Sequence, residues 1–329
     1  MIHFKRYMLL LLALLCLLAC VSGCAKQEEE ETIYYTVSFN SNGGSPIESQ
    51  TVAEHGRVSP VTPPTREGYL FDGWKSEHGS FWNFESDVPT SDMTLTAAWI
   101  SATSVFAYEP LNDTDAMLTE IKEQRADLPV PQILGGYTIT AIGDGVFSEI
   151  SSSKVQSISL PSTVTSIGED AFAGCENITI SFAADAVLTE LGAGAFLDCN
   201  RLGSVTLGEG LETIYADTFF GCSSLKEIRI PKSVTRLEDN AFSDCTSLMT
   251  VMLSSEVTEI GDSAFKGCTS LRTVYYYGTE EQLAELRTDN TAKKNDPFLY
   301  ATAYFYSATQ PTSDGNYWYL NDQGRPKLW

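Results

Sequence analysis

A short motif recurs at an almost constant interval through the second half of the chain. It consists of a small residue, a phenylalanine, two variable residues and a cysteine, and successive cysteines are 24, 23, 23 and 23 residues apart. The five copies end at Cys175, Cys199, Cys222, Cys245 and Cys268. A period in this range is typical of solenoids, whose units are each too short to bury an apolar face without a stacked neighbour. The interval therefore predicts a stacked repeat domain.

Each repeat also predicts a short β-strand. After Cys222, the apolar residues Leu225, Ile228 and Ile230 are spaced for one face of a strand, and Pro231 ends it. Strands of successive repeats are expected to pair in parallel about 4.8 Å apart. The phenylalanines of the motif then form an interior spine that comprises Phe172, Phe196, Phe219, Phe242 and Phe265.

The repeat matches a known pattern. The sequence Val-Thr-x-Ile-Gly-x-x-Ala-Phe-x-Gly-Cys occurs at residues 164–175 and 257–268. It resembles the bacterial surface-antigen (BspA-type) leucine-rich repeat, and the resemblance covers residues 128–278. It implies a mainly β solenoid with parallel strands, in surface or secreted proteins that bind proteins or adhere rather than catalyse. One repeat departs from the pattern at residues 178–183, where the strand loses one residue and the following loop gains two, so the register near residues 184–187 stays open.

The segment 35–99 reads as a small β domain of its own, with strands expected at residues 36–39, 50–52, 68–74 and 93–99. Three stretches carry a resemblance to the internalin-type B repeat, also called the Listeria–Bacteroides repeat: Val37-x-Phe39-x-x-Asn42-Gly43-Gly44, Pro64-Thr65-Arg66-x-Gly68-Tyr69-x-Phe71-x-Gly73-Trp74 and Leu95-x-Ala97-x-Trp99. The resemblance implies a β-grasp-like spacer that sometimes binds ligands. Trp74, Trp82 and Trp99 are expected in its core rather than in a sugar platform.

The N-terminus predicts export. Lys5 and Arg6 precede an apolar run that is too short for a membrane span of about 20 residues. Val21-Ser22-Gly23-Cys24 then resembles a bacterial lipobox, which implies removal of residues 1–23, lipidation of Cys24 and an acidic tether over residues 24–34. An ordinary cleaved signal and an uncleaved anchor are the alternatives.

Composition limits the kinds of partner and chemistry. The chain contains 21 Lys and Arg against 43 Asp and Glu, a net charge of −22, which argues against nucleic acid as a partner. Beyond the predicted signal only His55 and His78 are available as histidine bases, both in the small domain. With no phosphate-binding loop and no zinc spacing either, we expect no enzyme activity, no cofactor and no metal site.

The odd, strictly periodic set of five cysteines is a poor disulfide framework. We interpret the cysteines as buried small apolar residues that stay reduced, with partial pairing as the alternative because an exported protein meets oxidising conditions.

Both ends of the solenoid need caps, because a terminal repeat exposes apolar surface. Residues 100–127 are expected to form an N-terminal cap hairpin, with its turn at Asn112–Asp115. Residues 279–329 are expected to form a C-terminal cap: a short helix over 279–286, a strand and a hairpin with many aromatic side chains.

The outward position of each predicted strand defines a row of candidate ligand-binding residues: Ser159, Ser181, Thr206, Arg229, Met252 and Tyr275. Arg, Met and Tyr are enriched where interfaces are anchored, so the last three are the strongest candidates. The sequence thus predicts a lipid-anchored surface protein, on the extracellular face of the cell membrane, that binds an extracellular or host protein. A carbohydrate-binding or envelope-scaffold role through the small domain or the aromatic tail, including Trp318, is the alternative.

Overall fold

The structure is a computed structural model that describes residues 32–289, 294–312 and 315–329. The predicted signal, Cys24 and most of the predicted tether lie outside these residues. The chain divides into two compact units: the first holds residues up to 40, 46–62 and 74–96, and the second holds 41–45, 63–73 and 97–329. This division passes through the segment 35–99, whose boundaries as a domain stay a prediction.

The segment 35–99 contains the four expected strands. They form a sheet in the order β2-β1-β4-β3, with β1 and β2 antiparallel and β1 and β4 parallel. Their bounds are β1 (Tyr34–Asn40), β2 (Gln50–Ala53), β3 (Tyr69–Lys75) and β4 (Met93–Ser101). Trp74 is buried as expected, whereas Trp82 and Trp99 are only half-buried.

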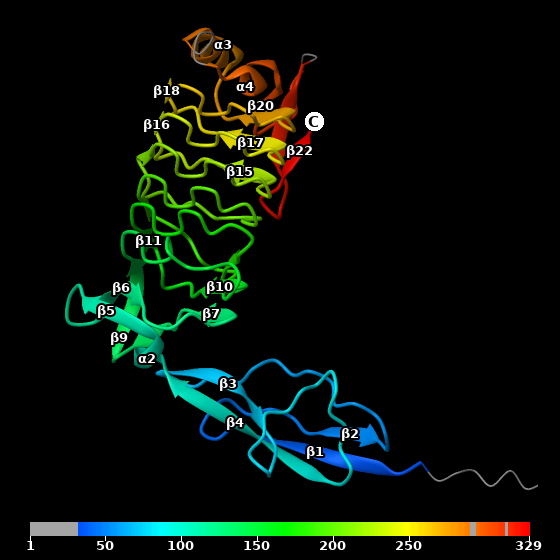
Figure 1. Cartoon of the computed structure of the whole chain (residues 1–329). Helices are drawn as coiled ribbons and strands as arrows, with labels where there is room; N and C mark the ends of the chain where they lie inside the picture. Colours follow the sequence, from blue (N-terminus) through cyan, green and yellow to red (C-terminus); the bar gives the residue numbers. More distant parts are fainter. Residues whose placement is uncertain (1–31, 290–293, 313–314) are drawn as a thin grey trace, which may run out of the picture. The chain divides into compact units, whose positions relative to one another are not determined.

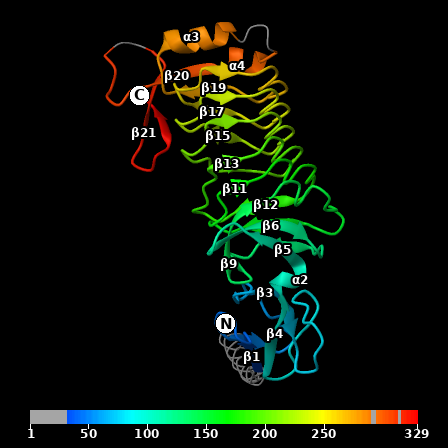
Figure 2. The same ribbon diagram turned by 90° about the vertical axis from the view of Figure 1, so that its left-hand side faces the viewer.

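The repeats stack as a solenoid (Figures 1 and 2), and the phenylalanines of the motif form a continuous spine inside it. Six fully buried rings, from Phe147 to Phe265, lie almost parallel with neighbouring centroids 4.7–5.6 Å apart. The constant phase of the motif explains this stack, because residues one period apart occupy equivalent places in successive turns. The predicted spine is confirmed.

One side of the solenoid carries the predicted parallel strands. They form two ladders, β12-β10-β7 and β15-β17-β19-β20-β21-β22, in which only β21 and β22 are antiparallel. Their bounds are β7 (Asp127–Pro129), β10 (Ser157–Leu160), β12 (Thr179–Phe182), β15 (Glu227–Arg229), β17 (Thr250–Leu253), β19 (Thr273–Tyr276), β20 (Thr302–Tyr306), β21 (Tyr317–Leu320) and β22 (Pro326–Leu328).

A second side carries further strands, and those of only two residues were not expected from the sequence. They also form two ladders, β13-β11-β9-β6-β5 and β14-β16-β18, and β8 pairs with β9. Their bounds are β5 (Phe106–Pro110), β6 (Asp115–Ile121), β8 (Ile133–Leu134), β9 (Tyr137–Ile142), β11 (Ser166–Ile167), β13 (Glu190–Leu191), β14 (Thr213–Ile214), β16 (Arg236–Leu237) and β18 (Glu259–Ile260). β5 and β6 are the predicted hairpin, and a short helix, α2 (Ala102–Val105), precedes it.

Both sides break at the same level, directly after the irregular repeat. Leu188 donates its N–H to the Thr206 carbonyl (3.0 Å) and accepts the N–H of Gly208 (2.7 Å), so the lengthened loop takes the place beside Thr206. Gly208 and Gly210 allow this close approach, since a Cβ on either would lie within 2.8 Å of residues 187–189. The register left open by the sequence is thus resolved as a local interruption of both ladders.

The C-terminal cap replaces a further repeat. α3 (Glu280–Asp289) begins as expected at Thr279, whose Oγ1 accepts the Gln282 N–H (3.3 Å), and it buries Leu283 and Leu286. The sequence did not lead us to expect α4 (Asp296–Tyr300). Its Phe298 ring stacks on Phe265 at 5.4 Å and extends the spine.

A buried asparagine fixes this cap to the last repeat. Asn295 is fully buried, donates Nδ2–H to the Gly261 carbonyl (2.9 Å) and accepts the Phe265 N–H (2.8 Å). In earlier repeats the corresponding phenylalanine N–H bonds to the carbonyl of the next turn, for example Phe242 N–H to Ala264 O at 2.8 Å. The amide of Asn295 therefore supplies the acceptor that the next repeat would have supplied.

Candidate functional site

The outward strand positions form the first candidate site, which we call the strand-face ladder: Ser159, Ser181, Thr206, Arg229, Met252 and Tyr275. The first four are exposed, while Met252 and Tyr275 are half-buried. Strand pairing places Ser159 beside Ser181, and Arg229, Met252 and Tyr275 side by side on β15, β17 and β19. Thr206 lies at the interruption, so the ladder consists of two separate stretches.

The C-terminal tail covers one end of the strand-face ladder. The Tyr275 ring packs against Tyr304 (5.7 Å) and Trp318 (5.2 Å). Burial raises the pKa of the Tyr275 phenol, and Tyr304 adds to the rise. Arg229 is therefore more open to a partner than Tyr275 is.

Trp318 belongs to the cap and cannot form a sugar platform. Its side chain is fully buried, its Nε1–H donates to the Tyr276 carbonyl (3.2 Å), and the rings of Tyr275, Tyr277 and Tyr306 surround it at 4.9–5.2 Å. A glycan stacks on an exposed aromatic face, which Trp318 does not offer. Trp318 therefore does not support the alternative role of the aromatic tail in carbohydrate binding.

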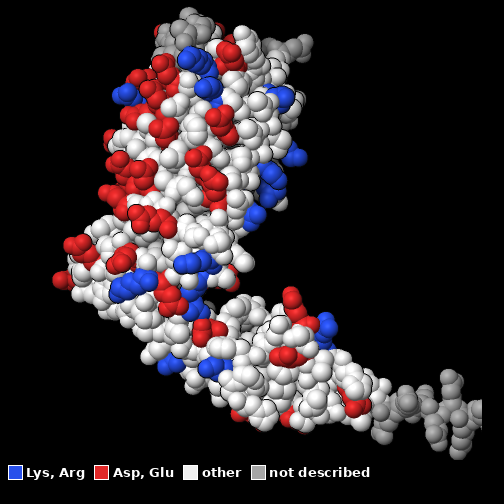
Figure 3. All heavy atoms as spheres, viewed as in Figure 1, with Lys and Arg blue, Asp and Glu red and all other residues white. Residues whose placement is uncertain are grey.

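Charges are segregated on the solenoid. Figure 3 shows Asp and Glu gathered over the side that carries β16 and β18, whereas Lys and Arg gather over the edge that carries β15 and β17. The strand-face ladder lies on the more basic side of a strongly acidic chain.

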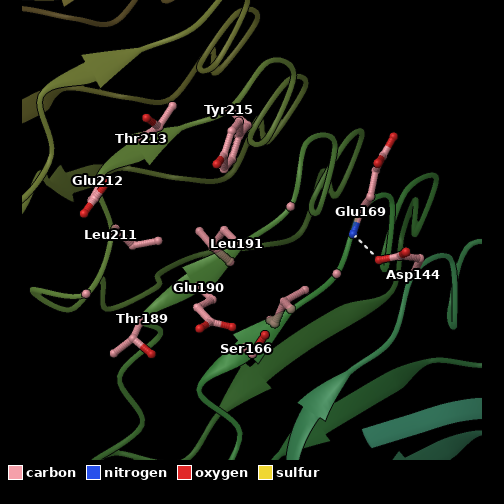
Figure 4. Close-up of a pocket in the computed structure, with 14 residues that line it drawn as sticks. Asp144, Ser166, Glu169, Thr189, Glu190, Leu191, Leu211, Glu212, Thr213 and Tyr215 are labelled. Carbon is pink, nitrogen blue, oxygen red and sulfur yellow. Dashed lines mark hydrogen bonds between the residues drawn. The ribbon is translucent and has the colours of Figure 1, made fainter.

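The break between β13 and β14 leaves a hollow of about 480 Å³ (Figure 4). Leu191 and Leu211 lie at its apolar part. Four carboxylates and no Lys or Arg line it, namely those of Asp144, Glu169, Glu190 and Glu212. The Asp144 carboxylate already has a partner within the protein, because its Oδ1 accepts the Glu169 N–H at 2.8 Å. The hollow is a consequence of the irregular repeat, and the sequence signal for it was the extra loop length.

The five repeat cysteines are free and fully buried, as predicted. Each Sγ lies 3.0–3.5 Å from the carbonyl of the phenylalanine 26–28 residues earlier, to which its S–H donates. The cysteine thus fills a small apolar space and also supplies a weak donor. Burial raises the pKa of four of the thiols: Cys199, Cys222, Cys245 and Cys268, the last to about 12.

We expect these thiols to resist alkylation by maleimide at pH 8 in the native protein and to react fully in urea, because only an exposed thiolate attacks. Above the ordinary pKa of 9.0 and up to about 12, Cys268 ionises only in the unfolded state, so native stability falls as pH rises by about 1.4 kcal/mol per unit for that thiol. Mass spectrometry of labelled protein and urea titrations at pH 8 and 10.5 measure both effects. Rapid labelling of the native protein contradicts the prediction.

Comparison with known families agrees with this geometry. Residues 140–272 match the model of the BspA type leucine rich repeat region in six copies. These residues form a BspA-type leucine-rich repeat region. Residues 35–98 match the Listeria–Bacteroides repeat domain. Both predicted resemblances are confirmed.

Several proteins are similar to parts of the chain. Internalin H of Listeria monocytogenes is 34% identical over 125 residues, which is 36% of this chain and 21% of that protein. A protein of Evansella cellulosilytica that is described as a membrane protein is 42% identical over 108 residues, which is 32% of this chain and 16% of that protein. The matched segments therefore span only a small part of these relatives.

Among solved structures, a leucine rich cell surface protein of Faecalibacterium prausnitzii is 26% identical, with a TM-score of 0.43 over 58% of this chain and 55% of the other. The leucine-rich repeat protein of T. pallidum is 21% identical, with a TM-score of 0.38 over 63% and 86%. The assignment of the BspA-type repeats does not depend on these likenesses.

In the residues that the structure describes, no group of three or more His, Cys, Asp and Glu side chains is placed to hold a metal ion. Within the same part of the chain, no helix has the length and apolar character needed to cross a membrane.

Proposed function

We propose that this protein binds a protein ligand through the strand-face ladder of its BspA-type repeats. The arrangement of Arg229 and Met252, adjacent on two paired strands and facing outward, carries the proposal. A parallel ladder holds such side chains at the strand spacing of about 4.8 Å, so they are preorganised for a partner. The ligand is an extracellular or host protein, and the contact serves recognition or adhesion.

The repeat family and the partial similarity to an internalin support a recognition role at the cell surface. A BspA-type solenoid supplies a long, rigid surface rather than a pocket for a reacting group, so the role proposed is binding and not catalysis.

An array of secreted and surface proteins, together with glycans, tests the proposal. We expect protein ligands to bind the chain lacking residues 1–23, and binding to weaken at least about tenfold in Arg229→Ala combined with Met252→Ala, because Arg and Met side chains anchor interfaces. Arg236→Ala with Thr213→Ala, on the other side of the solenoid, is the matched control. Glycan ligands alone, or equal binding by both double variants, contradict the proposal.

We further propose that the protein is held on the extracellular face of the membrane by a lipid on Cys24. The lipobox-like residues 21–24 support this, and a diacylated cysteine holds a protein on a bilayer far better than one chain does. Labelling cells with an alkyne fatty acid should tag the wild type and Cys20→Ser but not Cys24→Ser. If the Cys24→Ser variant still carries the fatty-acid label, Cys24 is not the lipidated residue. That outcome would not bear on the proposed ligand-binding face.

A further inference from the structure

Two methionines form the centre of an exposed patch on the C-terminal part of the solenoid. Met249 is 49% exposed, and Met252 lies on the adjoining strand β17. Three cationic residues occupy the positions beside them in the adjoining repeats: Lys226, Arg229 and Arg272. We call these five residues the methionine patch.

Backbone pairing fixes the positions within the methionine patch. Met249 donates its N–H to the Lys226 carbonyl (2.9 Å), and Arg272 donates its N–H to the Met249 carbonyl (3.1 Å), so these three residues occupy equivalent places in consecutive repeats. Three residues further along, Arg229 and Met252 are paired in register on β15 and β17. The patch is therefore two rows, each with a methionine next to a cation, and the outward row of Glu227, Thr250 and Thr273 lies between them.

The cations of the methionine patch are not neutralised by their surroundings. Throughout the part of the chain that the structure describes, no carboxylate forms an ion pair with Lys226, Arg229 or Arg272. Arg272 is held in place by bonds from its Nη1 to the carbonyls of Thr269 (2.8 Å) and Leu271 (3.0 Å). Glu227 is exposed on the same strand as Arg229 and leaves an excess of two positive charges.

Arg236 on the opposite side behaves differently. Its Nε lies 3.8 Å from Glu238 and 3.5 Å from Glu259, so its charge is shared with two carboxylates. Among the described residues only Arg125 and Arg236 form ion pairs, so what distinguishes the methionine patch is the grouping of three cations beside two methionines on a chain with a net charge of −22.

Building on the proposed function, we infer that the methionine patch binds an acidic peptide segment of the protein ligand, with Asp or Glu side chains next to a Leu, Ile or Phe. The guanidinium groups donate paired hydrogen bonds to carboxylates, and the thioethers adapt to apolar side chains of different shapes. A highly charged polymer fits less well, because the patch is half apolar and the rest of the molecule repels polyanions.

Selection from a library of random 12-residue peptides displayed on phage, against the protein lacking residues 1–23, tests the inference. We expect enriched peptides to combine Asp or Glu with a large apolar residue and to bind more weakly as salt rises. Arg229→Glu with Arg272→Glu should weaken a synthetic copy of such a peptide by about 30-fold, and Arg236→Glu should change it less than about twofold. Each variant should keep a cooperative unfolding transition, because the interactions that the changes remove lie at the surface.

Each other outcome overturns a defined part of the account. Peptides without an acidic preference, or heparin that binds more tightly than the peptides and is lost in the double variant, overturn the acidic-peptide inference. If Met252→Asp abolishes peptide binding and the double variant Arg229→Glu, Arg272→Glu binds as the wild type does, the strand-face ladder remains the binding face. The inference of an acidic peptide is then rejected. Binding that neither variant affects rejects both the inference and the proposed face.

Discussion

Replacing Phe219 by alanine is expected to lower the free energy of unfolding by about 3–5 kcal/mol and to divide unfolding into two transitions. The ring is fully buried and stacked between Phe196 (5.6 Å) and Phe242 (5.3 Å). It lies directly after the level at which both strand ladders are interrupted.

The spine and the adjoining turns connect the two halves at this level. The turns contribute backbone bonds such as Phe196 N–H to Thr218 O (2.9 Å) and Asp198 N–H to Phe220 O (2.7 Å). In a repeat array, cooperativity depends on the interfaces between neighbours, so removing a ring at the weakest interface should uncouple the halves.

Phe242→Ala is the matched control. Phe242 is equally buried and equally stacked, but both ladders continue past it through β15–β17 and β16–β18. We expect a similar loss of stability with a single transition. Hydrogen exchange measured by mass spectrometry during urea unfolding distinguishes the cases by comparing residues 137–191 with 202–276. A single transition in both variants contradicts the weak interface.

Trp318→Ala should lower the free energy of unfolding of the C-terminal cap by about 3–5 kcal/mol, because it removes a fully buried indole and its hydrogen bond to the Tyr276 carbonyl. Loss of this side chain frees the rings of Tyr275, on β19, and of Tyr277, directly after β19, which pack on it. Amide exchange should therefore rise in β19 and β20 and stay unchanged in β10.

Trp329→Ala provides the comparison for this variant. Trp329 is 44% exposed, its side chain donates one hydrogen bond, from Nε1 to the Ser307 carbonyl (3.0 Å), and its ring packs on Tyr319 at 4.2 Å, so we expect the change to alanine to cost only about 1 kcal/mol. If the two tryptophan variants are equally stable, Trp318 does not hold the cap.

The sequence was sufficient for the parts of the fold that repeat. A constant period places Phe172, Phe219 and Phe265 in one stack, because any other arrangement would lose equivalent contacts in every turn. Local signals were sufficient for α3, where Thr279 caps the helix, and for the β21–β22 hairpin around the Asn321–Gly324 turn.

The features of the fold that the sequence did not predict depend on contacts between residues far apart in the chain. Phe298 continues the spine, but α3 is inserted before it, so its distance from Phe265 in sequence no longer fits the period. The two-residue strands on the second side are too short to show an alternating pattern. The covering of Tyr275 by Trp318 required knowing how the tail folds back, which no local pattern in β21 records.

The most direct test of the central claim is the dissociation constant of a protein ligand from the array for two variants, Met252→Asp and Thr213→Asp. Both residues are half-buried strand positions, on β17 and β14, and both changes add the same charge. Recognition through the strand-face ladder predicts a dissociation constant raised at least about tenfold by Met252→Asp and left within about twofold by Thr213→Asp. Equal effects of the two changes, or an effect of Thr213→Asp alone, would contradict it.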